Sequence, residues 1–300
     1  MNEIDLGTIG IALITRYPKW YDGKLRSIRD TDKVRGDLAL QFIREATKRG
    51  CSLVVVEGES SLHFYEALKT FENDHVHIVK RQVKKRSPSK RLAIKKLMED
   101  KHIKAIIPTE AEKFSLITDC LSALVAPVLS NNADIVIPKR EENLFKLTYS
   151  GYMYVSELEG NRLYNELLKT NGLLPKTIED LDMFFGPRVI KNEKKIVNLF
   201  LKRYSFQIGE TEFPREYFDP EQLSGTTFFP IVQALKNKLR VTSIEVPFRY
   251  PKLQKENEET GVIELFIEKR RAQRLGLLVE LMHFVSFLER EKTSGIKLLV

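Results

Sequence analysis

The chain has 300 residues, of which 42% are hydrophobic and 30% are charged, and its formal net charge is +8. This is the composition of an ordinary globular protein that can bury a core. The sequence has no apolar run of about 18 residues, so no membrane span is expected. The positive charge favours an anionic partner, but it does not distinguish nucleic acid, nucleotide and lipid head group.

The cysteines and the first residues bear on the compartment. Cys51 and Cys120 both fall in apolar stretches, and two isolated cysteines make neither a disulfide framework nor a zinc site. The segment Met-Asn-Glu-Ile-Asp at the start is not an apolar secretory segment. We therefore expect a reducing, cytoplasmic location.

In the first third of the chain, strand patterns alternate with helical patterns. Apolar runs predict strands at 10–15, 51–57 and 75–79, and apolar periodicity predicts helices around 38–46 and 62–71. This alternation is typical of a parallel sheet with helices on its faces. The aromatic loop 16–23 follows the first strand. It is either part of a ligand-binding edge or a turn that Trp20 pins to the core.

Two acids follow the run Ile103–Pro108, which has the pattern of a short central strand. Open α/β sheets bind ligands beyond the carboxyl ends of their strands, where Glu110 and Glu112 would lie. Two carboxylates spaced one residue apart can converge on Mg²⁺ or Mn²⁺, which prefer oxygen ligands. The alternative is a solvated loop whose acids favour the start of the next helix.

The stretch 80–96 contains nine Lys or Arg residues and no acid. Ser87-Pro88 is a helix-start signal, and the apolar residues that follow it require part of the charge to be a solvated helix face. Arg86 and Lys90 would lie at the helix start, where backbone N–H groups favour phosphate. The run has no interleaved aromatic residues for base stacking, so nucleic acid is an unlikely partner.

The second half of the chain continues with strand and helix patterns. Strands are predicted at 133–138 and 240–250, and helices at 156–171, 193–203 and 228–235. A long helical pattern covers 262–290. Its apolar stripe indicates core packing and consists of Leu277, Leu278, Leu281, Val285 and Leu288.

The order of these segments resembles that of the family-2-like glycosyltransferases with the GT-A fold, in particular the group of mannosylglycerate and glucosyl-phosphoglycerate synthases. The resemblance covers about residues 9–252, and it rests on the shared order of weak motifs. The matching segments are Thr15-Arg16-Tyr17, Glu57, Lys90, Glu110-Ala-Glu112, Ala133–Arg140, Asp182–Arg188 and Val241–Tyr250.

The resemblance implies an α/β fold of GT-A type, a mainly parallel sheet with helices on both faces. Residues 1–255 would form this domain. Residues 256–300 would be a C-terminal helical extension that packs on it or on a partner subunit, where a homo-oligomer could form. The implied enzyme is a hexosyltransferase that moves a sugar from a UDP- or GDP-sugar to a small-molecule or glycan acceptor.

The resemblance also implies roles for individual residues. Thr15, Arg16, Tyr17 and Glu57 would contact the nucleoside, and Arg86 and Lys90 the diphosphate. Glu110 and Glu112 replace the usual Asp-x-Asp and would hold a divalent cation, Mg²⁺ or Mn²⁺. The acceptor would lie over 149–188. Asp182 is the favoured catalytic acid and Glu221 the reserve.

Several departures from the family pattern leave alternatives open. The segment Gln222-Leu-Ser-Gly-Thr-Thr stands where the family often has an acid pair, and no His follows Val246-Pro247 closely. The enzyme would then use a different base, or retain configuration and need none. The alternatives in other classes are a nucleotidyltransferase and a non-catalytic nucleic-acid or anion-binding protein that uses the basic run 80–96.

Overall fold

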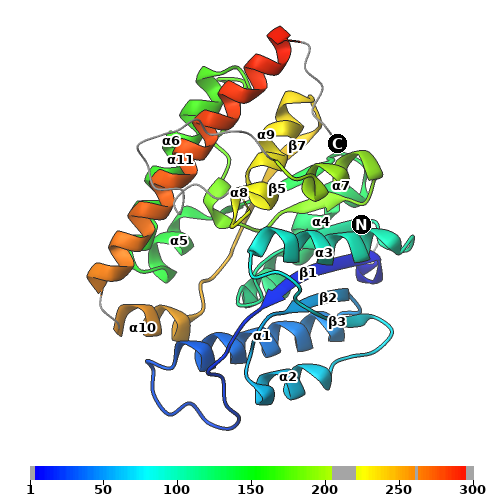
Figure 1. Cartoon of the computed structure of the whole chain (residues 1–300), viewed down its shortest axis with the longest axis vertical. Coiled ribbons are helices and arrows are strands. Elements are labelled where there is room, and N and C mark those ends of the chain that lie inside the picture. The colour runs from blue at the N-terminus through cyan, green and yellow to red at the C-terminus, as the bar shows by residue number, and fades with distance from the viewer. Residues whose placement is uncertain (1–3, 205–220, 261–262, 295–300) are drawn as a thin grey trace.

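The computed structural model describes residues 4–204, 221–260 and 263–294. It contains a seven-stranded sheet with the order β3-β2-β1-β4-β6-β5-β7 (Figure 1). The strands are β1 Ile9–Thr15, β2 Ser52–Glu57, β3 Val76–Lys80, β4 Ala105–Pro108, β5 Ile135–Arg140, β6 Val189–Lys191 and β7 Val241–Val246.

Strand pairing aligns the carboxyl ends at one edge of the sheet. β1 pairs in parallel with both β2 and β4, and β2 pairs in parallel with β3. The register brings Thr15, Glu57 and Lys80 into one row across three strand ends. β6 is antiparallel to both β4 and β5, whereas β5 and β7 are parallel. The sheet is therefore mainly parallel, as the sequence predicts.

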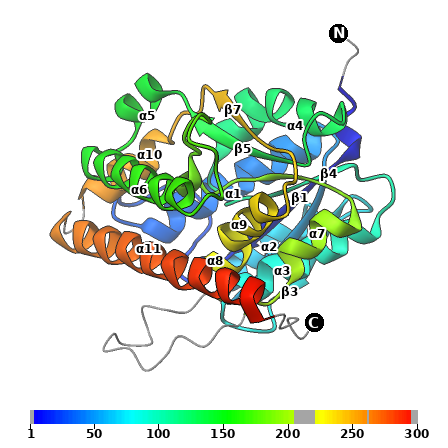
Figure 2. The same cartoon turned by 90° about the horizontal axis from the view of Figure 1, so that it is seen from above.

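Helices cover both faces of the sheet (Figures 1 and 2). Their bounds are α1 Thr31–Lys48, α2 Leu62–Lys69, α3 Arg86–Glu99, α4 Leu121–Leu129, α5 Glu142–Thr148, α6 Gly151–Thr170, α7 Lys194–Leu201, α8 Ser224–Thr227, α9 Phe229–Lys236, α10 Lys252–Thr260 and α11 Ile263–Ser294. Three short turns of other helix types are Leu6–Thr8, Leu116–Cys120 and Met183–Phe185.

Two hydrophobic cores lie on opposite faces of the sheet. In β1, Ile11 and Leu13 pack against α1, α2 and α4, whereas Ala12 points to the core formed with α3, α6, α7, α9 and α11. β4 alternates in the same way, with Ile107 in the first core and Ile106 in the second. This period of two is what a strand buried on both faces requires.

β4 is the fourth of the seven strands, and all four of its residues are buried. The prediction of a central strand before Glu110 is thus confirmed. The burial arises because helices pack on both faces of a run that has no polar residue. The residues after Pro108 are consequently fixed at the middle of the carboxyl edge, where a ligand site is most accessible from several strands.

α11 packs along α6, and the two helices lie side by side in Figures 1 and 2. Its predicted apolar stripe is buried in the second core: Leu277, Leu278, Leu281, Val285 and Leu288. The core role expected for the stripe is confirmed. The division of the chain at residue 255 stays a proposal.

Two local predictions differ from the structure. Residues 142–148 form α5, although no helix was expected there. α3 begins at Arg86 rather than at the Ser87-Pro88 signal. Ser87 does not cap the helix, because its Oγ lies 3.2 Å from Thr226 Oγ1 and its backbone N–H donates to the carbonyl of Glu221 at 2.8 Å. A contact with a distant segment has replaced the local cap.

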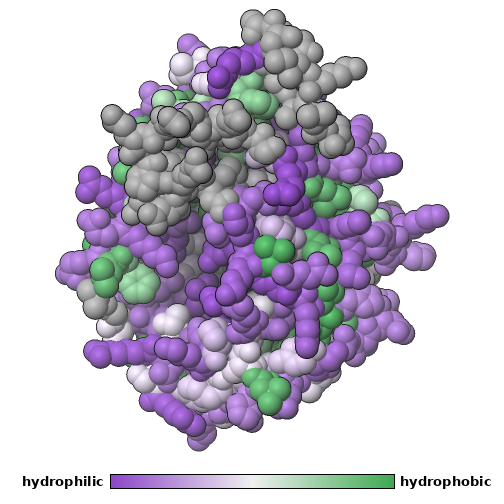
Figure 3. Space-filling view, in the orientation of Figure 1, coloured by the Kyte–Doolittle hydropathy of each residue, from purple (hydrophilic) through white to green (hydrophobic). Residues whose placement is uncertain are grey.

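The face shown in Figure 3 is mainly hydrophilic, and its hydrophobic side chains form small separate patches. Among the described residues, no helix combines the length and the apolar character needed to cross a bilayer.

Trp20 pins the loop after β1 to the first core. It is 5% exposed, its indole N–H donates to Asp37 at 2.9 Å, and its ring packs edge-on against Phe64. A Cβ atom on Gly36 of α1 would lie only 2.3 Å from Cδ1 of this ring. The close approach of helix and indole therefore requires glycine at position 36.

We expect Gly36→Ala to lower the free energy of unfolding. Overpacking costs about 1–3 kcal/mol, whereas alanine gains at most about 1 kcal/mol of helix propensity over glycine. Denaturant unfolding measures the difference. The matched control is Gly151→Ala in α6, where a Cβ would meet no atom within 4 Å. An equally stable Gly36→Ala protein would contradict the packing described here.

Candidate active site

A cavity of about 570 Å³ lies at the carboxyl edge of the sheet, beyond the end of β4. Its walls come from segments far apart in the sequence: the residues after β4, the starts of α3 and α6, the turn before β6, and helices α1, α10 and α11. Arg86, Glu110 and Glu112 are among its lining residues. The strand-end position expected for a ligand site therefore coincides with a cavity.

Glu110 lies between two lysines in this cavity. Its Oε1 is 3.7 Å from Lys90 Nζ, and its Oε2 is 3.8 Å from Lys113 Nζ. Burial raises the pKa of Glu110, but the charges of Lys90, Lys113 and Arg86 outweigh this effect and hold the pKa below its usual value. Glu110 is therefore a carboxylate at neutral pH. Its Oε2 is buried and accepts no hydrogen bond within the described residues.

The turn before β6 approaches Glu110 closely. Gly186 has a φ of +98°, a conformation that favours glycine. A Cβ at this position would lie 3.1 Å from Glu110 Oε2. The structure thus brings the predicted turn 182–188 against the predicted strand-end acid.

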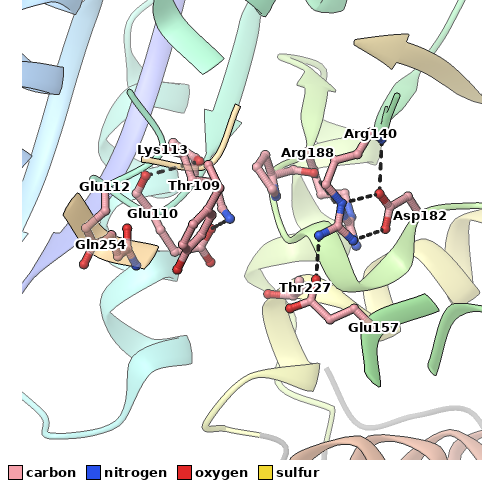
Figure 4. A network of polar contacts seen from close by, with 12 residues as sticks. Thr109, Glu110, Glu112, Lys113, Arg140, Glu157, Asp182, Arg188, Thr227 and Gln254 are labelled. Atoms are coloured by element: carbon pink, nitrogen blue, oxygen red, sulfur yellow. Dashed lines mark hydrogen bonds and ion pairs between the residues drawn. The ribbon is translucent and has the colours of Figure 1, made fainter. Parts of the chain in front are cut away.

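Glu112 has a different environment from Glu110. Its Oε1 accepts a hydrogen bond from the Tyr17 hydroxyl at 3.0 Å and forms an ion pair with Arg35 Nη2 at 2.8 Å. Burial, reinforced by the charge of Glu112, holds the pKa of Tyr17 well above its usual value, so the phenol remains a donor. Figure 4 shows Glu110, Glu112 and Lys113 grouped together, with Gln254 nearby.

The start of α3 brings two cations to the cavity region. Arg86 is the first residue of the helix, is exposed and lines the cavity. Lys90 is 6% exposed, and its ammonium group donates to Thr227 Oγ1 at 3.4 Å. Burial lowers the pKa of Lys90 and of Lys113, and the charge of Glu110 opposes that effect in both. Three cations therefore surround one carboxylate.

The residues predicted to contact the nucleoside lie outside the cavity lining, at the ends of β1 and β2. Glu57 is buried and accepts a hydrogen bond from the backbone N–H of Ser60 at 2.7 Å. Arg16 forms an exposed ion pair with Glu59 at 3.2 Å. Thr15 is fully buried, and its Oγ1 has no hydrogen-bond partner among the described residues. Of the four, Tyr17 reaches the cavity wall, through Glu112.

Asp182 is held in a buried ion-pair network behind the cavity wall. Both of its carboxylate oxygens accept from the Arg140 guanidinium at 2.7 Å, and Asn161 Nδ2 donates to Oδ1 at 2.7 Å. Arg140 also pairs with Glu157 at 2.5 Å (Figure 4). Of these residues, Glu157 lines the cavity and Asp182 does not.

Glu221 connects the segment before α8 to α3. Its carboxylate forms an ion pair with Arg91, and its backbone carbonyl accepts from the N–H of Ser87 at 2.8 Å. Glu221 is not among the residues that line the cavity. Each of the two predicted catalytic acids is therefore paired with an arginine, Asp182 with Arg140 and Glu221 with Arg91.

Several cavity residues were missed by reasoning from the sequence. Arg35 and Lys113 contact the two acids, and α10 and α11 contribute Glu258, Lys269 and Arg274. Lys113 gave a weak signal, because it follows Glu110 by three residues. Arg35 and the α10 and α11 residues gave none, since their role depends on how distant helices pack.

No protein-family model matches the chain, and no curated protein matches it by sequence. Similar solved structures include glucosyl-3-phosphoglycerate synthase from Mycobacterium tuberculosis in complex with Mn²⁺, uridine diphosphate and phosphoglyceric acid. That match has 9% identity and a TM-score of 0.47, and covers 89% of this chain and 78% of the other. Another is 4-diphosphocytidyl-2C-methyl-D-erythritol synthase from Anaerococcus prevotii, with 10% identity, a TM-score of 0.43, and coverage of 89% and 96%.

These structures include one of the enzymes in the group that the order of motifs resembles. At this level of similarity, the comparison carries no conclusion about activity.

The Arg140–Asp182 pair predicts a pH-dependent loss of stability. Burial raises the pKa of Asp182, but Arg140 and Asn161 outweigh it, so the pKa lies below its usual value. Stability from a depressed carboxyl pKa is fully present above the unfolded-state pKa of about 4, and is lost as the pH falls through the folded-state pKa.

We expect Asp182→Asn to lower the free energy of unfolding by about 3–5 kcal/mol at pH 7, because it leaves Arg140 partly unpaired. The difference from the wild type should shrink below about pH 4. Urea unfolding across this pH range measures both effects. A variant as stable as the wild type at pH 7 would contradict the structural role of Asp182.

Proposed function

We propose that this protein is a glycosyltransferase, of hexosyltransferase type, that uses a nucleoside-diphosphate sugar as donor. The observation that supports the proposal most directly is the cavity beyond β4. There, Arg86, Lys90 and Lys113 surround Glu110 at the carboxyl edge of a mainly parallel sheet. The motif order described from the sequence supports the same activity.

The three cations would bind the diphosphate of the donor. Arg86 is the first residue of α3, where unsatisfied backbone N–H groups and the helix dipole also favour phosphate. Negative charge increases on the diphosphate as the bond to the sugar breaks. Cations placed beforehand at this position lower the energy of the transition state more than that of the bound substrate.

The resemblance implies a divalent cation. Glu110 would hold it through Oε2, which accepts no hydrogen bond within the described part of the chain and lies 3.8 Å from Lys113 Nζ. Among the described residues, no group of three or more His, Cys, Asp or Glu side chains is arranged so that it could hold a metal ion by itself. The other ligands would be diphosphate oxygens and water, a usual environment for Mg²⁺. Glu112 Oε1 already contacts Arg35 and Tyr17. When bound, the cation would supply charge to the leaving group.

The two substrates would occupy different parts of the carboxyl edge. The UDP or GDP part of the donor would extend from the cations toward the ends of β1 and β2, at Thr15–Tyr17 and Glu57. The acceptor would enter over 149–188, since Tyr149, Met153 and Gly186 all line the cavity. Asp182 and Glu221 remain proposed acids, and each would have to leave its arginine to accept a proton.

The basic run does not form the uniform surface that nucleic-acid binding would require. Lys90 is buried, and Arg91 is paired with Glu221. Lys84 and Lys95, in contrast, are exposed. These different environments favour a small phosphate ligand over the alternative of a nucleic-acid or anion-binding protein. A nucleotidyltransferase would use the same cations on a nucleoside triphosphate.

We expect Arg86→Gln and Lys113→Gln each to weaken UDP or GDP binding by roughly tenfold to hundredfold, the usual worth of a hydrogen bond to a charged group. Lys95→Gln, on the exposed side of the same helix, should bind as the wild type does. Isothermal titration calorimetry measures the affinities. Equal losses of DNA affinity in all three variants, with no nucleotide binding, would instead support the nucleic-acid alternative.

The two acids should respond differently to substitution. Glu110→Gln should fold stably and lose the gain in UDP or GDP affinity that Mn²⁺ gives the wild type, because the amide lacks the charge that binds the cation. Glu112→Gln should instead lower the melting temperature, because it removes the charge opposite Arg35. Calorimetry with and without Mn²⁺, beside melting curves, tests both. Manganese-dependent binding that is unchanged in Glu110→Gln would contradict its proposed role.

A further inference from the structure

Helix α10 forms one wall of the cavity, and its residue Gln254 lies near Glu110 and Glu112 in Figure 4. Gln254 and Glu258 are four residues apart and therefore lie on one face of the helix. Both line the cavity, as does Tyr250 just before the helix. Gln254 and Glu258 follow the region 9–252 that resembles the glycosyltransferases, and Tyr250 is near its end.

Glu258 is a buried carboxylate with one oxygen left unsatisfied. It is 8% exposed, and its Oε1 accepts from the Tyr250 hydroxyl at 2.8 Å and from Gln254 Nε2 at 3.3 Å. Its Oε2 is buried without a hydrogen-bond partner in the described part of the chain. Burying such an atom without a partner costs free energy, so a ligand or an ordered water that pairs with it would stabilise the protein.

Arg35 brings an unsatisfied donor to the same cavity. One end of its guanidinium pairs with Glu112, but its Nε–H is buried and has no acceptor among the described residues. The charge of Glu112, followed by smaller effects that include Glu258, raises the pKa of Arg35 above its usual value. The cavity wall near α10 therefore contains one unpaired hydrogen-bond donor, Arg35 Nε–H, and one unpaired acceptor, Glu258 Oε2, among the described residues.

The charges at this end of the cavity restrict the class of ligand. A cation would meet Arg35 and, on α11, Lys269 and Arg270, which line the same cavity. An anion would meet the carboxylates of Glu112 and Glu258. A neutral group that both donates and accepts hydrogen bonds satisfies both orphan atoms. A hydroxyl does so, and two neighbouring hydroxyls of a sugar ring can serve Glu258 and Arg35 together.

We propose that Glu258, Gln254 and Arg35 form a subsite for the hydroxyl groups of a sugar ring. The inference rests on the proposed function for the identity of that ring, which is the transferred sugar of the donor. The cations around Glu110 would then bind the diphosphate, and the polar face of α10 would select the sugar. Pairing of hydroxyls with a buried carboxylate can discriminate strongly between sugars.

The test compares Glu258→Gln with Glu259→Gln, its exposed neighbour on α10. In Glu258→Gln, an amide NH₂ replaces the unsatisfied oxygen, since Tyr250 and Gln254 both donate to the other one. Calorimetry gives the affinities for UDP, UDP-glucose, GDP and GDP-mannose. We expect Glu258→Gln to weaken the preferred nucleotide sugar at least tenfold and the matching nucleotide less than twofold. Glu259→Gln should match the wild type.

The outcomes separate this inference from the proposed function. Equal weakening of nucleotide and nucleotide sugar would overturn the inference, because the loss would then not depend on the transferred sugar. Unchanged binding of all four compounds by Glu258→Gln would overturn the inference and leave the proposed function intact. Melting curves show whether Glu258→Gln is folded. If it is not, Gln254→Leu, which removes the other polar group on this face, is tested in its place.

If the wild type binds no nucleotide, the proposed function fails, and free monosaccharides decide the subsite. Saturation-transfer NMR with glucose and mannose would then show contacts in the wild type and in Glu259→Gln, and none in Glu258→Gln. Absence of such contacts in the wild type would overturn the inference.

Discussion

The site depends on the buried guanidinium of Arg140. This side chain at the end of β5 joins Asp182, in the turn before β6, to Glu157 in α6, and it stacks on the ring of Phe145 at 3.6 Å. Buried charges are costly unless each is paired and hydrogen-bonded. Here the pairing fixes three segments relative to one another. It also holds Gly186 against Glu110, because the turn between Asp182 and β6 is short.

Much of the fold follows from hydrophobic periodicity. The order of strands and helices, the central position of β4 and the buried stripe of α11 can all be predicted, because each depends on a pattern within one segment. The start of α3 could not be predicted, because the Ser87 side chain contacts Thr226 and does not cap its own helix. The antiparallel direction of β6 could not be predicted either, because the side chains of a three-residue strand do not indicate which way it pairs.

The candidate site was less predictable than the fold. Sequence position was enough to place Glu110 and Glu112 at a strand end, but it did not show that the two carboxylates have different partners. This difference arises because Arg35 of α1 and Tyr17 of the loop after β1 both contact Glu112. Likewise, the sequence around Asp182 does not indicate that its carboxylate pairs with Arg140. Such long-range pairs leave no local trace in a single sequence.

The packing of α11 has a consequence for synthesis on the ribosome. Leu281, Phe284 and Leu288 cover the core formed with α6, α7 and α9. While the chain is being made, that apolar face of the sheet and of its helices therefore stays exposed until α11 has left the exit tunnel. The first core is completed earlier, since its last buried residues are Val246, Phe248 and Tyr250. The nascent protein would thus pass through a half-covered state, which is the kind of species that chaperones bind.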